Sequence, residues 1–258
     1  MINAIRADIY RLFHSKGFWI TQAVMALIVV ISIVAQKVGS VGVSMTSSSD
    51  APAKTAAAQA PLWTPPYALL NFQTMSPLLI YFLLSLFVII IGYDLKMKTL
   101  KNLFSSGMSR PHFFFSKFLI FNVIILIQFI LYFGLTFITA AILHGIGHYP
   151  SSFFSIFFGA WLLQLLFVQA IFAVGILVLY LTFSTVWAVL AIIIFPIAIS
   201  LASVITKLNW LNYFDFQSAM GAANNLPHGQ IYKLILSALA AIIVLVGASY
   251  FYFQKKDL

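Results

Sequence analysis

Inside the long apolar segments of this sequence, the polar side chains that could take part in chemistry are few: mainly four glutamines and scattered Ser and Thr. Four glutamines interrupt its long apolar segments: Gln22, Gln128, Gln164 and Gln169. Amides in such surroundings usually hydrogen-bond a neighbouring helix, and this is how we interpret the set. Gln164 and Gln169 are also candidates for lining the path of a substrate. None of the apolar segments carries Asp, Glu, Lys or Arg, so the paired carboxylates of acid–base catalysis are missing.

One histidine pair has a spacing that can hold a metal. His144 and His148 stand at i and i+4, which places two imidazoles on one face of a helix. Two glycines separate them, however, and no third ligand is evident. The absence of cysteine removes thiolate ligands and thiol nucleophiles. We therefore expect no metal site and interpret this segment as a turn.

Nucleotide-binding motifs are absent from the sequence. There is no GxxxxGK[ST] loop, whose backbone amides and lysine would hold phosphates, and no GxGxxG turn. The 14 Lys and Arg residues are too few and too scattered for a nucleic-acid groove. We expect a chain that is not an enzyme, holds no cofactor of its own and binds no nucleic acid.

The composition excludes a water-soluble globule. Of the 258 residues, 62% are apolar and only 7% are charged, and the mean hydropathy is +1.04. A soluble domain carries about 25% charged residues. The chain lacks the polar surface to cover itself, so we expect an all-α, polytopic membrane protein forming one transmembrane domain over 1–258.

Six apolar runs are long enough for a helix to cross about 30 Å of hydrocarbon. They cover residues 18–35, 76–93, 118–143, 153–181, 187–205 and 234–253. Pro196 predicts a kink inside the fifth. Of the 14 basic residues, ten fall on the side of the two termini and four on the other side. The positive-inside bias therefore places both termini in the cytoplasm, with the chain in a plasma membrane and in contact with anionic lipid.

Three segments outside the spans have a pattern of their own. Residues 1–17 repeat apolar residues at helical spacing, with Asp8 and Arg11 elsewhere on the wheel, and predict an interfacial helix. Residues 36–75 predict a long outer loop that is rich in Ser, Thr and Ala. Residues 207–232 are aromatic and predict short helices that lie in or re-enter the outer interface.

The loop 94–112 between the second and third spans predicts a short amphipathic helix on the cytoplasmic side. Its apolar stripe consists of Met97, Leu100, Leu103 and Phe104. Lys101 lies on the polar side, Asp94 can cap the start, and Gly107 ends the helix before Pro111. Two interpretations remain open: a helix that lies on lipid, or a docking element that fits a groove on a cytoplasmic partner.

This loop carries a resemblance to a known family. The stretch 99–110 reads TLKNLFSSGMSR and is followed by Phe115-Ser-Lys117. It is similar to the signature after the second span in the membrane subunit of bacterial ABC transporters of the type-2 exporter class. The order of elements along nearly the whole chain resembles that class too. One departure is Lys98, which stands where the family commonly has glycine.

The resemblance implies a working unit of two permease chains and two cytoplasmic ABC ATPase subunits. ATP and magnesium would be held by the ATPases. Residues 96–106 would be the coupling helix, 1–17 the connecting helix and 208–230 the outer re-entrant helices. The residues that would dock on the ATPase are Met97, Leu100, Lys101, Leu103, Phe104 and Arg110.

The resemblance also suggests a function in the bacterial plasma membrane. Short members of the class are similar to permeases that export antimicrobial peptides or bacteriocins, or give immunity to them. The expected cargo is amphipathic: a peptide, a drug or a lipid-like molecule. The alternative is a non-transporting scaffold or immunity protein that sequesters a toxin. An intramembrane enzyme, a channel and an ion-coupled carrier fit less well, because polar groups are missing from the spans. The sequence leaves the cargo, export against immunity, and a homodimer against a heterodimer open.

Overall fold

A computed structural model describes residues 2–37, 63–92, 107, 109–208 and 210–255. All regular structure in these residues is helical, which confirms the all-α class. The helices are α1 (Ile2–His14), α2 (Lys16–Val34), α3 (Pro65–Thr74), α4 (Leu78–Phe87), the π-helix η2 (Val88–Gly92), α7 (Arg110–His144), α8 (Phe153–Thr182), α9 (Thr185–Thr206), the 3₁₀ turn η3 (Leu211–Phe214), α10 (Phe216–Gly221), the 3₁₀ turn η4 (Ala223–Asn225) and α11 (His228–Lys255).

Five of the described helices are long and apolar enough to cross a membrane: α2, α7, α8, α9 and α11. The pair α3 and α4–η2 passes the same test only together, and it is bent by 70° at the break between its halves. The fold is therefore that of a multi-pass membrane protein. The second expected span, 76–93, corresponds to the α4–η2 half of this bent pair, which is either a broken span or a re-entrant loop.

The start of the second span differs from the sequence-based expectation. Residues 65–74 were expected to belong to the outer loop 36–75, but they form helix α3. Pro65 and Pro66 occupy its first turn, where a missing N–H costs nothing. Phe72 is fully buried, and α3 packs against α7 and α8. The two prolines and the polar Asn71 and Gln73 concealed this buried helix in the sequence.

Helix α7 is longer than the third predicted span. It begins at Arg110, eight residues before the predicted start, and runs for 35 residues. At 1.5 Å per residue its length is about 52 Å. This exceeds the roughly 30 Å of a hydrocarbon core, so the helix is tilted or extends beyond it. Its first turn takes up the end of the expected loop 94–112, of which residues 94–106 lie outside the described residues.

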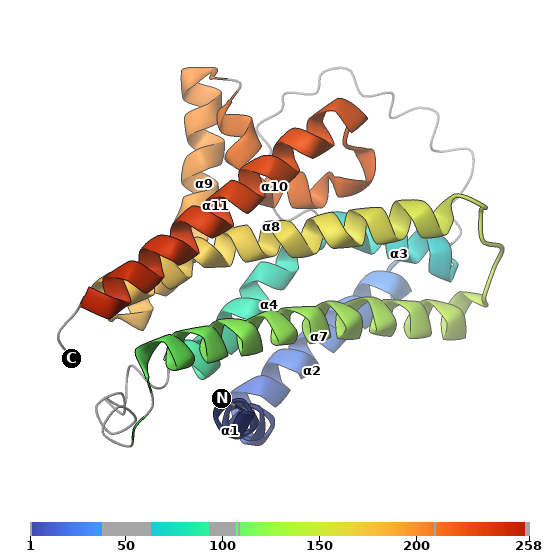
Figure 1. Ribbon diagram of the computed structural model, residues 1–258. Helices are drawn as coiled ribbons and strands as arrows, with labels where there is room; N and C mark the ends of the chain where they lie inside the picture. Colours follow the sequence, from blue (N-terminus) through green and yellow to red (C-terminus); the bar gives the residue numbers. More distant parts are fainter. Residues whose placement is uncertain (1, 38–62, 93–106, 108, 209, 256–258) are drawn as a thin grey trace.

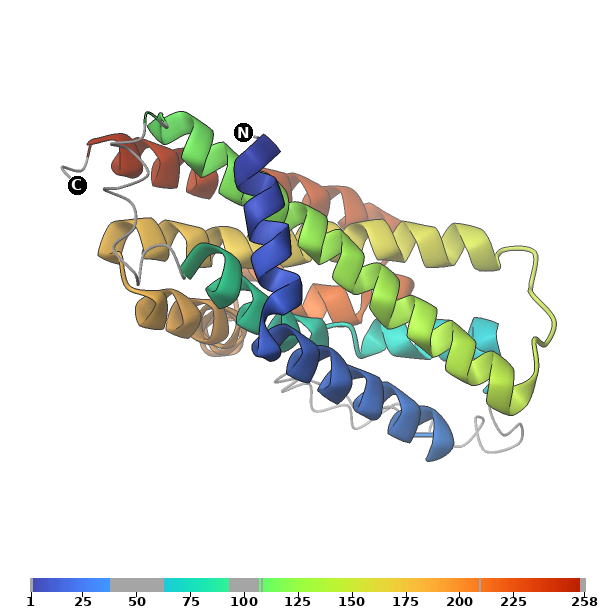
Figure 2. The same cartoon turned by 90° about the horizontal axis from the view of Figure 1, so that it is seen from below.

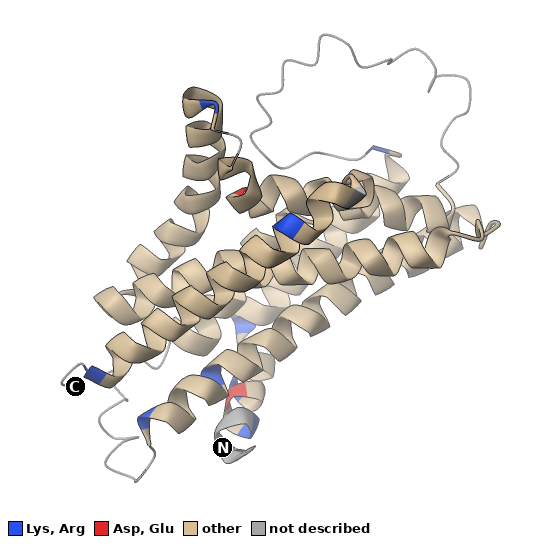
Figure 3. Ribbon diagram, turned by 45° about the horizontal axis from the view of Figure 1, so that its top comes forward, with Lys and Arg blue, Asp and Glu red and all other residues tan. Residues whose placement is uncertain are grey.

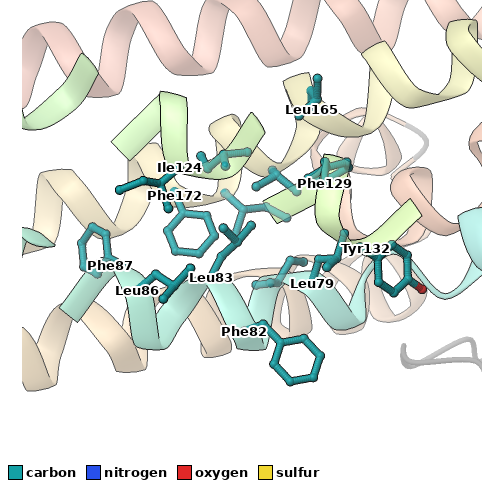
Figure 4. Packing of buried hydrophobic residues seen from close by; sticks show 14 of the residues in the cluster. Leu79, Phe82, Leu83, Leu86, Phe87, Ile124, Phe129, Tyr132, Leu165 and Phe172 are labelled. Atoms are coloured by element: carbon teal, nitrogen blue, oxygen red, sulfur yellow. The ribbon is translucent and has the colours of Figure 1, made fainter. Parts of the chain in front are cut away.

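Helix α8 forms the centre of the bundle. In the most apolar part of α8, 61% of the residues are buried, against 17% in α9 and in α11. Figure 1 shows α8 with α7 and α11 beside it, while α9 diverges from the bundle. Apolar side chains of α4, α7 and α8 fill the space between these helices (Figure 4). The rings of Phe87, Phe121 and Phe172 meet there at centroid distances of 5.0 to 5.7 Å.

The contact between α8 and α9 depends on the absence of a side chain at Gly175. A Cβ built there would lie 2.4 Å from two carbon atoms of Ile192 on α9. We expect Gly175→Ala to lower the free energy of unfolding by about 1–3 kcal/mol, because the two helices must move apart. Gly159→Ala is the matched control on the same helix, because nothing lies within 4 Å of its Cβ. Thermal unfolding in detergent checks this; equal stability of the two variants would contradict the close packing.

Candidate functional site

A group of charged residues gathers at the end of the bundle that carries both termini (Figure 3). Asp8 and Arg11 come from α1, and Lys117 comes from the third turn of α7. Figure 2 shows α1 lying across this end, over α7. The carbonyl of Ile90 in η2 completes the group, which we call the ion cluster. It connects α1 to η2 and α7, the two elements on either side of residues 93–106.

The distances in the ion cluster are those of strong, charge-assisted hydrogen bonds. The ammonium of Lys117 donates to both carboxylate oxygens of Asp8, at 2.7 and 2.6 Å. The guanidinium of Arg11 donates to one of them at 3.0 Å. Both cations also donate to the Ile90 carbonyl, Arg11 at 3.1 Å and Lys117 at 3.4 Å. One carboxylate and one backbone carbonyl are thus shared by two cations.

Because Asp8 and Lys117 are both buried, the loss of either partner should be costly. Asp8 is 5% exposed and Lys117 is 4% exposed. Removing one member of such a pair leaves a charge without compensation in a medium of low dielectric constant, which costs about 3–5 kcal/mol. The position of α1 on the bundle is therefore fixed by charge as well as by the buried side chain of Leu12.

The orientation of α1 departs from the expected amphipathic helix. A helix in this segment is confirmed. Asp8, however, was expected on a polar face and instead points into the bundle. Ile9 and Phe13, two of the apolar residues that recur at helical spacing in this segment, are 39% and 46% exposed and face away from the bundle. Sequence reasoning missed the pair of Asp8 and Lys117. The available signal was a single acidic residue in the leader and a lysine flanked by Phe113–Phe115 and Phe118.

Arg110 provides a second connection at the same end. Its guanidinium donates to the backbone carbonyl of Gln254 in the last turn of α11, at 2.7 Å. Next to it, Phe114 of α7 packs on Tyr180 of α8 and on Phe253 of α11. The start of α7 is therefore joined to α1, α8 and α11. The other predicted docking residues, Met97, Leu100, Lys101, Leu103 and Phe104, lie outside the described residues.

Gln164 lies in the bundle at the break between α3 and α4. Its side chain is fully buried, and its amide nitrogen donates to the carbonyls of Gln73 at 2.9 Å and Met220 at 3.1 Å. The last four carbonyls of a helix have no partner within that helix. Gln164 therefore acts as a hydrogen-bond donor to the interrupted backbone.

Two further side chains serve the same break. The Tyr132 hydroxyl donates to the carbonyl of Phe72 at 3.1 Å, and the Asn224 amide donates to that of Leu70 at 3.1 Å. Gln169, the other residue proposed for a substrate path, lies five residues beyond Gln164 and about 140° around the helix. It is partly buried and makes no hydrogen bond within the described part of the chain. The structure does not bring the two glutamines together.

The histidine pair does not share a helical turn. His144 is the last residue of α7, and Gly145 follows it with φ at +75°. His148 lies in the loop beyond, so the helical spacing that could hold a metal is interrupted. Across the ranges that the structure describes, no group of three or more potential metal ligands occurs.

Fold and site together define a multi-pass α-helical membrane protein with a buried ion cluster at its terminal end. Comparison of the sequence with protein-family models and with curated proteins finds no match.

The ion cluster predicts a strong coupling between Asp8 and Lys117. We expect Asp8→Asn to lower the free energy of unfolding by about 3–5 kcal/mol, because it takes the carboxylate away from the buried ammonium of Lys117. Lys117→Met should cost less, because Arg11 still donates to the Asp8 carboxylate. The double variant should lose less than the sum of the two. Thermal unfolding in detergent, analysed as a double-mutant cycle, measures the coupling. Lys16→Met, at an exposed lysine, is the control; additive losses would mean that the two residues act independently.

The two glutamines of α8 provide a matched test of their roles. Gln164→Leu should lower the free energy of unfolding by about 1–3 kcal/mol, because the buried carbonyls of Gln73 and Met220 each lose one of their donors and keep the one from Ser76. Gln169→Leu removes the same amide from a site without a hydrogen bond and should leave the stability close to that of the wild type. Thermal unfolding of both variants gives the comparison. A stable Gln164→Leu protein would show that the break does not need this donor.

Proposed function

We propose that the chain is the permease subunit of an ATP-driven ABC exporter that moves an amphipathic substrate out of the cell or the membrane. The proposal rests on the resemblance of residues 99–117 to the type-2 exporter signature and on the absence of a phosphate loop from the chain. The observation that carries the proposal is that both ends of residues 93–106 are attached to helices of the bundle, η2 on one side and α7 on the other. Gly92, just before them, ends η2, and Arg110, just after them, begins α7.

The ion cluster supports a mechanical role for the segment between these ends. A force applied to residues 93–106 would reach η2 and α7 directly. It would reach α1 through Asp8, which Lys117 and Arg11 hold within 3.0 Å. Contiguous networks of hydrogen bonds and ion pairs carry energetic coupling between the elements that they join. In the proposed cycle, ATP closes two partner ATPases, the docked segments move, and a pair of permease chains rocks to open an outward path.

The proposed assembly has a second permease chain and two cytoplasmic ATPases. ATP and magnesium bind to the ATPases and not to this chain. The apolar faces of α2, α9 and α11 are exposed and are available to lipid or to the second permease. Basic residues predominate at the end that holds both termini, which supports a cytoplasmic position for that end in a bacterial plasma membrane. Export of, or immunity to, an antimicrobial peptide is the proposed context.

Co-purification tests this function. The tagged chain, extracted gently from its native membrane, should bring a soluble ATPase with it in equal amount. Leu103→Asp combined with Phe104→Asp should reduce the bound ATPase at least tenfold, because charges would enter an apolar groove. Leu103→Met is the matched control and should retain the ATPase.

Each outcome separates the proposal from its alternative. A chain that purifies alone, from cells that still show its phenotype, would favour a scaffold that sequesters a toxin without transport. An ATPase that remains bound to the double variant would remove the docking role from residues 96–106 while leaving an ATPase partner in place.

A further inference from the structure

A polar cavity of about 500 Å³ lies at the end of the bundle opposite to the termini. It is open on one side and lies between η3, α10 and the first turns of α11. The polar residues that line it are Asn212, Tyr213, Asp215, Ser218 and Gln230. The side-chain amides of Asn212 and Gln230 make no hydrogen bond within the described residues and are therefore available to a bound molecule.

Asp215 is the charged group of this cavity. It is 9% exposed, and one of its carboxylate oxygens, Oδ1, accepts the backbone N–H of Ser218 at 3.1 Å. The other oxygen, Oδ2, has no hydrogen bond, and no basic side chain of the described residues forms an ion pair with Asp215. The carboxylate also borders a second cavity of about 190 Å³, between α4, α9 and α10. A buried acceptor thus faces open space on two sides.

The charge of Asp215 selects the kind of group that would bind there. Taking a carboxylate out of water is costly unless a cation or several donors compensate it. Asp8, the other carboxylate in the described residues, is already paired with Lys117. Lys233 is near the cavity, but its ammonium lies 3.5 Å from the Tyr213 hydroxyl and 5.6 Å from the ring centroid of Tyr213. An incoming ammonium or guanidinium would supply the charge that the protein itself does not.

An apolar groove of about 660 Å³ adjoins the polar cavity. It runs between α8 and α11 and is lined largely by aliphatic side chains, among them Leu162, Leu166, Ile231 and Ile235. Leu226 borders both spaces and forms a common wall. A polar space with an uncompensated negative charge therefore lies beside a space that suits a hydrocarbon chain.

We propose that this end of the protein binds a cationic amphiphile, with its ammonium or guanidinium group against Asp215 and its apolar part in the groove between α8 and α11. The inference goes beyond the proposed transport function and does not require the ATPase, because it concerns binding to the isolated chain. Failure of binding and failure of ATPase docking are therefore separate results.

Competition binding tests the site on the full chain in a non-ionic detergent. Dansylcadaverine, a fluorescent primary amine with an apolar ring system, is the probe, and octylammonium and octanol are the competitors. Octylammonium should displace the probe, and octanol, which has the same chain without the charge, should be at least tenfold weaker. Asp215→Asn should weaken octylammonium at least tenfold, while Asp215→Glu keeps the charge and should bind within a few-fold of the wild type.

Two controls separate a lost contact from a damaged fold. Asn is a good N-cap, so Asp215→Asn keeps the acceptor for Ser218. Asp257→Asn removes the same charge near the C-terminus and should leave the affinity unchanged. Gly159 lines the groove and nothing lies within 4 Å of a Cβ built there, so Gly159→Leu should place its side chain in the groove and weaken octylammonium but not butylammonium.

The same assay identifies the source of the ligand. Displacement by phosphatidylethanolamine would assign the site to a lipid headgroup, and its failure beside displacement by octylammonium would assign it to a water-soluble amphiphile. Equal affinity for octylammonium and octanol, or an affinity that Asp215→Asn leaves unchanged, would overturn the proposal. So would a probe signal that does not saturate.

Discussion

The interruption between α3 and α4 exposes backbone carbonyls inside an apolar bundle, where water is not available to satisfy them. An unsatisfied group in such surroundings costs several kcal/mol. Local bonds such as Ser76 N–H to the Gln73 carbonyl satisfy part of the break, and other elements bring further donors to it. Gln164 of α8, Tyr132 of α7 and Asn224 of η4 do this. Their donors determine how α7, α8 and the α10–η4 segment are placed around the break. The arrangement of this half of the molecule follows from the need to satisfy one bend.

Buried charged groups at the terminal end are under the same constraint, because each of them also needs a partner. Asp8 can be buried because Lys117 and Arg11 donate to it from two helices. The Ile90 carbonyl accepts a further hydrogen bond from each of the two cations. The two ends of the molecule therefore use different chemistry for the same purpose. Amides satisfy the backbone at the break, and an ion cluster fixes the elements on either side of residues 93–106.

Long-range polar contacts account for most of what the sequence did not reveal. Five apolar runs predicted helices because length and hydropathy alone decide a span, and the composition predicted the class of protein. Helix α3 was missed because its burial depends on partners in α7 and α8, distant in the sequence. The pairing of Asp8 with Lys117 joins residues 109 positions apart, and no local pattern encodes it. Gln164 was recognised as polar and buried, but its partners, two backbone carbonyls, have no sequence signal.

Helix α7 also has the properties of a lever. It is one unbroken rod of 35 residues, about 52 Å long, that is held near one end by Asp8 and near its middle by the contact of Tyr132 with Phe72. A rigid rod converts a small angle at one end into a large displacement at the other. A tilt of about 10° about the contact at Lys117 would carry the far end of the helix, about 40 Å away, through about 7 Å. Small movements around the ion cluster are therefore geometrically sufficient to rearrange the opposite end of the bundle.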